Sequence, residues 1–142
     1  MIRLKYTKTR ATALEPRQAT AGSACLDLAA AETIKILPGE TMLVGTGLSF
    51  EFPSAYEMQL RPRSGMSLKT GLRFANSVGT IDSDFRGEVC VLAWNAGKEP
   101  LTIRQGQYIA QAILAKRVEC RLVEVSELTP TERGCGGFGH SG

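Results

Sequence analysis

The sequence lacks any apolar run long enough to cross a membrane as a helix, which takes roughly 20 residues. Residues 1–5 also lack the apolar centre of a secretory signal. The 17 Lys and Arg residues are scattered and the net charge is only +3, so no basic block is present for a nucleic acid. We therefore expect a cytoplasmic protein with neither a membrane nor a nucleic acid as its partner.

Histidines and closely spaced cysteines are also scarce, which argues against several kinds of site. His140 is the only histidine, and Cys25, Cys90, Cys120 and Cys135 lack the close spacing of a zinc site. A reducing compartment argues against disulfides as well. Cys90 and Cys120 fall in apolar or alternating patterns, and we interpret them as small buried hydrophobic residues.

What the sequence does contain is a succession of short apolar or alternating segments, separated by glycine and proline turns. Its 142 residues, 43% of them hydrophobic, fit one domain with a modest core. We expect strands at residues 2–6, 34–37, 41–52, 56–61, 72–76, 78–81, 88–94, 101–103, 108–114 and 118–125. Residues 64–71 are the one helix candidate. The pattern predicts an all-β barrel or jelly roll over residues 1–130.

Two segments suggest contacts beyond a single folded chain. Residues 88–94 look too apolar to face water on either side, which favours an oligomer whose subunits cover one another. Residues 131–142 form a glycine-rich tail that contains Arg133 and Phe138. This tail is either a disordered terminus or a flexible arm that closes over a ligand.

Residues 61–87 carry the highest density of reactive and charged groups. Arg63, Ser64 and Gly65 stand where the short helix should begin. Free N–H groups, a hydroxyl and a guanidinium at such a place suit phosphate. The simpler alternative is an ordinary helix start with a surface arginine.

Asp82 and Asp84 close the same segment. In a strand their side chains would point to one side, and a carboxylate near bound phosphates can activate water. The alternative is a polar turn with solvated acids.

Asp27 and Gln111 are polar residues inside apolar runs. A lone acid such as Asp27 needs an arginine, backbone N–H groups or a hydrated cation as its partner. Gln111 needs hydrogen bonds if it is buried, and these come either from the protein or from a ligand.

Together these segments resemble the trimeric deoxyuridine triphosphatase (dUTPase) family over almost the whole chain. Five separate motifs occur in the family's order: ACLDL at 24–28, PRSG at 62–65, ANSVGTIDSDFRG at 75–87, GQYIAQ at 106–111 and RGCGGFGHSG at 133–142. The third and fifth motifs are highly specific.

The resemblance implies a homotrimer of jelly-roll-like subunits with active sites at subunit interfaces. The reaction would convert dUTP and water into dUMP and pyrophosphate, with Mg²⁺ on the triphosphate. It would supply dUMP for thymidylate synthesis and keep uracil out of DNA. Asp82 would activate the water that attacks the α-phosphorus, and Asp27 would hold the metal indirectly, through water.

The remaining roles are implied for substrate binding. The phosphate-binding residues would be Arg63, Ser64, Gly65 and Gln111, with Arg133 from the tail. The uracil-reading hairpin would comprise Asn76 and the main chain of Thr80, Ile81 and Asp82, with a backbone contact from Cys90. The arm, residues 131–142, would place Phe138 over the base and Gly139, His140 and Ser141 nearby.

The sequence departs from the family pattern at several positions. Phe85 replaces a usual tyrosine under the sugar, so steric rejection of ribose should survive while a hydroxyl bond is lost. Tyr108 stands where arginine is common, which puts a local ion pair or subunit contact in doubt. Cys25-Leu26 and Ala75 also differ from the usual residues.

Two other functions are alternatives to this one. A dCTP deaminase would keep the fold, but it needs a catalytic glutamate beside the base and lacks a Gly-Phe-Gly arm of this kind. A catalytically silent trimer that binds nucleotide and signals to a partner would be expected to lose Asp82, Arg133 or Phe138. All three residues are present.

Overall fold

The computed structural model describes residues 2–137 and 139. The strands within them are β1 Lys5–Lys8, β2 Leu26–Ala29, β3 Ile34–Ile36, β4 Thr41–Gly45, β5 Leu48–Glu51, β6 Tyr56–Pro62, β7 Leu72–Phe74, β8 Gly79–Ile81, β9 Cys90–Asn95, β10 Leu101–Ile103 and β11 Tyr108–Lys116. The described part of the chain has one helix, α1 Ser64–Lys69. Among these residues, no helix has the length and apolar character needed to cross a membrane.

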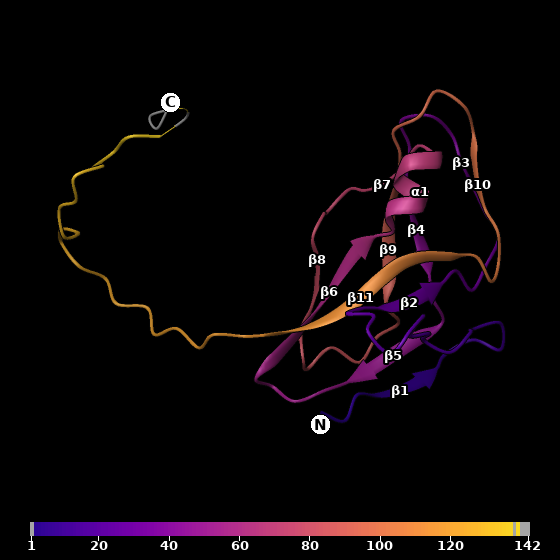
Figure 1. Ribbon diagram of the computed structural model, residues 1–142, viewed down its shortest axis with the longest axis horizontal. Coiled ribbons are helices and arrows are strands. Elements are labelled where there is room, and N and C mark those ends of the chain that lie inside the picture. Colours follow the sequence, from indigo (N-terminus) through magenta and orange to yellow (C-terminus); the bar gives the residue numbers. More distant parts are fainter. Residues whose placement is uncertain (1, 138, 140–142) are drawn as a thin grey trace.

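All strand pairs are antiparallel, and most join segments far apart in the chain. One sheet has the order β2-β11-β6-β8 and another the order β4-β9-β7, while β1 pairs with β5 and β3 with β10. Such long crossovers are typical of jelly rolls. Figure 1 shows the strands gathered in one body with α1 at one end. The expected all-β class is confirmed.

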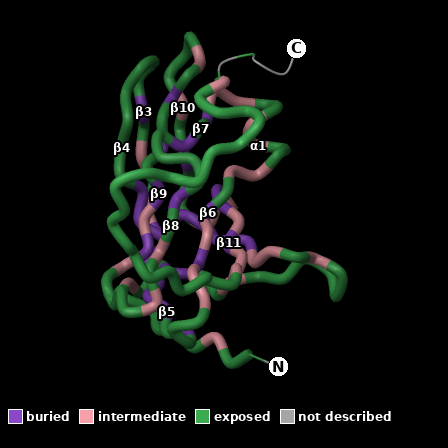
Figure 2. The backbone as a smooth tube through the Cα atoms, turned by 90° about the vertical axis from the view of Figure 1, so that its left-hand side faces the viewer, coloured by how far each residue is buried: buried purple, intermediate pink, exposed green. Residues whose placement is uncertain are grey.

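The core lies between the sheets, where alternate residues of the strands point inward. Leu28 of β2, Leu60 of β6, Val91 of β9 and Ile109 of β11 are all buried. Figure 2 shows the buried residues concentrated along the inner strands, with exposed residues in the loops and termini. Each such side chain contributes about 1.5–3 kcal/mol to folding by leaving water.

One polar side chain ties the end of β9 to its surroundings. Asn95 is fully buried, and its amide donates to the carbonyls of Ile36 and Glu99 at 3.0 and 2.8 Å. Its oxygen accepts the Gly97 N–H at 3.0 Å. These three bonds compensate for the burial of the amide, which would otherwise destabilise the fold.

Within one chain, residues 88–94 are buried on one face only, so the expected cover by another subunit stays a prediction. In β9, Val91 and Ala93 are buried, whereas Leu92 and Trp94 are 36% and 40% exposed. The strand has one neighbour on each side, β4 and β7, and its outer face is partly exposed.

The expected strand at residues 118–125 is wrong, because β11 ends at Lys116 and no strand follows. Backbone N–H and C=O groups form a strand only beside a partner, and here the chain leaves the barrel, as Figure 1 shows. Its apolar side chains are left in solvent, with Leu122 95% exposed.

Candidate functional site

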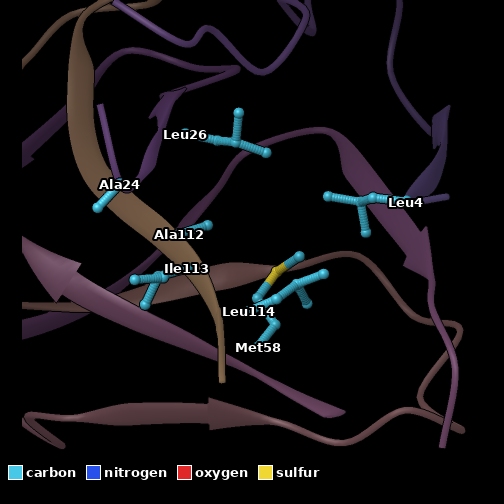
Figure 3. Close-up of a pocket in the computed structure, with 7 residues that line it drawn as sticks. All are labelled: Leu4, Ala24, Leu26, Met58, Ala112, Ile113 and Leu114. Atoms are coloured by element: carbon cyan, nitrogen blue, oxygen red, sulfur yellow. The ribbon is translucent and has the colours of Figure 1, made fainter. Parts of the chain in front are cut away.

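One cavity of the barrel does not fit the proposed chemistry. It measures about 290 Å³ and is lined only by apolar side chains, including Leu26, Met58 and Leu114. Figure 3 shows these side chains around it, without a polar group among them. A phosphate-bearing ligand would lose its hydration there without gaining a partner. The candidate residues lie around two other cavities.

The first of these, a cavity of about 320 Å³, lies at the start of α1. Its lining comprises Arg63, Ser64, Gly65, Met66, Lys69, Thr70 and Gln111. The helix begins as expected, although its N-cap is Arg63 and no side chain caps it. The Ser64 and Gln111 side chains both line this cavity and can therefore reach a ligand in it.

Strand register explains why these residues meet. Gln111 of β11 lies opposite Asp27 of β2 and Arg61 of β6. Paired residues in a sheet project to the same face, so all three do. Arg63 comes two residues after Arg61 in extended backbone, with φ −83° and ψ 131°, and therefore returns to that face. The sheet thus gathers Asp27, Arg63 and Gln111.

Arg63 is held by two fixed acceptors. Its Nε lies 3.2 Å from Asp27 Oδ1, its Nη2 lies 3.3 Å from Asp27 Oδ2, and its Nη1 donates to the Tyr108 carbonyl at 3.0 Å. A guanidinium has five N–H groups, so two remain. The ion pair that the sequence left open for Asp27 is therefore present, and Arg63 can still grip an anion.

Asp27 fits only an indirect contact with a metal ion. No group of three acidic, cysteine or histidine side chains that could hold a metal occurs among the described residues. The Asp27 side chain is 7% exposed, and three N–H groups of Arg17 and Arg63 already point at its oxygens. A carboxylate offers about four lone-pair sites, so one more donor, such as a metal-bound water, can be accepted.

Arg17 belongs to this cluster and was missed by sequence reasoning. Its Nη2 lies 3.1 Å from Asp27 Oδ2, and its guanidinium carbon lies 4.0 Å from the Tyr108 ring centroid. The sequence pattern around Arg17 does not predict its contact with Asp27 or Tyr108. Only the β2–β11 pairing brings Tyr108 to it.

The candidate base-reading residues lie in the turn between β7 and β8 and on β8 itself. The expected hairpin is not formed by these two strands, because β7 pairs with β9 and β8 pairs with β6 in a different sheet. Gly79 is buried against Leu60 of β6, and a Cβ there would come within 3.3 Å of the Leu60 Cβ and 3.6 Å of the Asn76 amide nitrogen. Asn76 is exposed and, unlike Asn95, its amide has no partner in the described chain. Thr80 and Ile81 follow in β8, so their main-chain groups come shortly after Asn76 in the chain.

Asp82 lies in a different cavity from Arg63. This second cavity measures about 420 Å³, and its lining comprises Ser54, Tyr56, Glu57, Asp82, Ser83, Asp84 and Arg117. β8 ends at Ile81, so the two aspartates follow a strand and do not lie in one; the turn, and not alternation, brings both to the cavity. Asp82 is exposed and forms no ion pair with a described residue.

The loop after Asp82 is braced by its own groups. The Phe85 N–H donates to the Asp82 carbonyl at 3.2 Å, and Arg86 donates to the carbonyls of Ser83 and Phe85 at 2.7 and 3.0 Å. A Cβ on Gly87 would come within 2.5 Å of the Phe85 ring. A side chain at Gly87 would therefore displace the exposed Phe85 ring from this position.

Cys90 opens β9 beside this loop and lies opposite Gly45 of β4. Burial raises the pKa of its thiol, and the nearby Glu88 carboxylate raises it further, against a smaller opposing effect of Arg10. The thiol therefore stays protonated near neutral pH. It is suited to packing and a backbone contact, but not to nucleophilic attack.

The two polar cavities lie at opposite ends of β6. Asp82 follows Ile81, whose partner is Met58, and it shares its cavity with Glu57. Arg63 comes six residues after Glu57, which at about 3.3 Å per residue puts it roughly 20 Å away. The phosphates of one nucleotide cannot bridge that gap, so one chain does not bring Asp82 and Arg63 together.

None of the described tail residues lines either cavity. Arg133 is exposed, and its Nε donates to the Gly136 carbonyl at 2.8 Å. Gly139 is exposed with a φ of +98°, which a side chain would rarely adopt. Phe138, His140 and Ser141 lie outside the described residues, so their roles stay predictions.

Comparisons with known proteins agree with these motifs. A family model described as dUTPase matches residues 11–142. The "Deoxyuridine 5'-triphosphate nucleotidohydrolase" of Nautilia profundicola is 47% identical over 141 residues, covering 99% of both chains.

Solved structures agree as well. The Staphylococcus bacteriophage 80alpha dUTPase with dUPNHPP gives a TM-score of 0.90 at 26% identity, covering 99% of this chain and 98% of that one. A mutant dUTPase from phage phi11 of S. aureus, solved to reveal the coordination of a structural Mg(II) ion, gives 0.84 at 22% identity and covers 90% of this chain and 99% of that one.

The family model, the near-complete coverage of the relative and the shared jelly-roll-like fold lead to one conclusion: this chain belongs to the dUTPase family.

Proposed function

We propose that this chain hydrolyses dUTP to dUMP and pyrophosphate in the cytoplasm, supplying dUMP for thymidylate synthesis and keeping uracil out of DNA. The observation that carries the proposal is the position of Asp82. This exposed carboxylate follows directly on β8, the edge strand beside β6 that carries the candidate base-reading residues Thr80 and Ile81. A base read by these residues would therefore present its sugar and first phosphate to Asp82.

Uracil is selected by hydrogen bonds. The unpaired Asn76 amide and the main chain of Thr80, Ile81 and Asp82 offer donors and acceptors in fixed positions. Cytosine exchanges a donor for an acceptor and leaves buried groups unpaired, which discriminates strongly. The close packing of Gly79 on Leu60 leaves the backbone of β8 little freedom to admit the thymine methyl group.

Asp82 acts as the general base. It takes a proton from a water molecule whose oxygen then bonds to the α-phosphorus, while the bond from that phosphorus to the bridging oxygen breaks and pyrophosphate leaves. Phe85 packs under the sugar and excludes a 2′-hydroxyl by its bulk. Its ring is 44% exposed and is therefore accessible to a ligand.

The phosphates bind at the other cavity. Two N–H groups of Arg63, the Ser64 hydroxyl, the Gly65 main chain and the Gln111 amide provide donors for the phosphate oxygens. Mg²⁺ on the triphosphate would neutralise negative charge that opposes attack. Asp27 would orient the Mg²⁺ ion through one water, which would donate to the carboxylate lone pair that Arg17 and Arg63 leave open.

The separation of Asp82 from Arg63 supports a homotrimer with active sites at subunit interfaces. One subunit contributes the base-reading residues and Asp82, and a neighbour contributes the phosphate cluster. Leu43 of β4 and Leu92 of β9 lie opposite each other on an exposed face beside Trp94. Such adjoining exposed apolar side chains are typical of contact surfaces.

The C-terminal segment completes the site. Residues 118–128 expose several apolar side chains that a neighbouring subunit would cover. Residues 131–142 form the arm, with Arg133 on the terminal phosphate, Phe138 over the base, and Gly139, His140 and Ser141 nearby. Residues 1–130 form the domain that carries this arm.

The substrate assignment predicts a sharp preference in a four-nucleotide assay. With Mg²⁺, purified protein should release pyrophosphate from dUTP far faster than from dCTP, dTTP or UTP, because only deoxyuridine satisfies both the base-reading residues and the space at Phe85. Pyrophosphate release is measured at equal nucleotide concentrations. Similar rates on all four nucleotides would contradict the assignment, and ammonia released from dCTP would favour a deaminase.

The role of Asp82 predicts a loss of turnover without loss of binding. Asp82→Asn should lower kcat at least about 100-fold, since the amide cannot accept the proton. Affinity for a non-hydrolysable dUTP analogue should change little. Asp84→Asn serves as the matched control. If Asp82→Asn turns over nearly as fast as the unsubstituted protein, another group is the base.

The shared site predicts complementation between two inactive variants. Arg63→Gln and Asp82→Asn each remove one half of every site. In mixed trimers made by co-expression, about a quarter of the sites combine an intact Arg63 with an intact Asp82 from different subunits. Activity should therefore return to about a quarter of the normal level. Mixed trimers as inactive as their parents would show that both halves come from one chain.

The arm assignment predicts that removal of residues 131–142 spares the fold. The truncated protein should keep its melting temperature, because the described tail residues pack on nothing in the chain, but should lose most of its kcat/KM. Differential scanning calorimetry and the pyrophosphate assay test the two parts. A large fall in melting temperature would make the tail a structural element.

A further inference from the structure

We propose that Arg17, stacked on Tyr108, is a positioning residue that aligns Arg63 for phosphate binding. Arg17 lies in none of the five motifs, and it does not line either polar cavity. It acts through Asp27 and Tyr108, which both contact Arg63. The inference rests on the proposed function only in taking the Arg63 cavity as the phosphate site.

Arg17 is fixed to β2 by its backbone. Its N–H donates to the Asp27 carbonyl at 3.0 Å and its carbonyl accepts the Asp27 N–H at 2.8 Å, forming an isolated antiparallel bridge. Residues paired in this way project to one face. The Arg17 guanidinium is therefore delivered to the Asp27 carboxylate, 3.1 Å from Oδ2.

Tyr108 touches both arginines through different groups. Its ring lies 4.0 Å from the Arg17 guanidinium carbon, within the range of a cation–π contact, while its carbonyl accepts a hydrogen bond from Arg63 at 3.0 Å. Its ring also lies 5.7 Å from the guanidinium carbon of Arg63. A change in Arg17 can thus reach Arg63 by two routes, Asp27 and Tyr108.

The alignment matters because the Asp27 carboxylate can rotate about its last bond with little resistance. Arg17 fixes Oδ2, and Arg63 then meets both oxygens with Nε and Nη2. Without Arg17, the carboxylate would follow Arg63 and no longer hold it in one orientation. The two remaining N–H groups of Arg63 would then point in a wider range of directions. An anion would have to order them when it binds, which weakens binding.

The charge of the cluster supports a role in binding anions. Two guanidinium groups share one buried carboxylate, which leaves one net positive charge beside the cavity. The Arg17 side chain is half exposed, and the buried Asp27 carboxylate keeps Arg63 as a partner when Arg17 is removed. Arg17 contacts both partners of Arg63 and is therefore placed to control the orientation of Arg63.

The experiment compares full-length variants with two probes. Inorganic tripolyphosphate reports the phosphate site alone, and deoxyuridine, as a competitive inhibitor of dUTP hydrolysis, reports the base and sugar site alone. Arg17→Met should weaken tripolyphosphate binding roughly five- to twentyfold, with deoxyuridine inhibition unchanged. Arg104→Met removes a different exposed arginine and serves as the control for net charge.

Conservative variants separate the ring from the rest of Tyr108. Tyr108→Leu should weaken tripolyphosphate binding in the same direction as Arg17→Met, and Tyr108→Phe, which keeps the ring face, should bind more tightly than Tyr108→Leu. Combining Arg17→Met with Tyr108→Leu should cost less than the two effects multiplied together, because both remove the same contact.

The outcomes separate this inference from the proposed function. Tripolyphosphate affinity unchanged in Arg17→Met overturns the positioning role, and so does a parallel loss of both probes together with a lower melting temperature. An unsubstituted protein that binds tripolyphosphate but neither binds nor hydrolyses dUTP would overturn the proposed function. In that case the tripolyphosphate comparison still tests Arg17.

Discussion

The length of β6 is the constraint on which the proposed site depends. This strand, Tyr56–Pro62, separates the cavity around Asp82 from the one around Arg63 by roughly 20 Å, and paired strands on both sides keep it extended. A hydrogen-bonded strand inside a sheet cannot shorten or fold back. In the proposed site, the two halves would therefore meet only if separate subunits supply them.

The buried charge of Asp27 imposes a second constraint at one end of that strand. A carboxylate at this depth is costly unless it is paired, and Arg17 and Arg63 both pair with it. The pairing serves binding as well as folding, because it leaves Arg63 two free N–H groups. By contrast, Asp82 at the other end is exposed and forms no ion pair with a described residue, which suits the proton-accepting role proposed for it.

Sequence reasoning located the chemical groups better than their arrangement. Arg63, Ser64 and Gln111, named from two separate motifs, do line one cavity, and the short helix begins at Ser64. However, alternation suggested that Asp82 and Asp84 extend a strand, whereas the chain turns after Ile81. The pattern of residues 118–125 predicted a strand because apolar side chains tend to be buried. The pattern does not show whether the same chain or another chain buries them.

The sequence alone determined the all-β class, the turns and the identity of the candidate groups, because side-chain alternation and glycine or proline breaks are local properties. Only the tertiary structure decided which of these groups meet. Strand register places Asp27 opposite Gln111, stacks Arg17 on Tyr108 and puts Asp82 at the far end of β6 from Arg63. A local pattern fixes which face of a strand is buried, but the strand that pairs with it comes from a distant segment that the local pattern does not name.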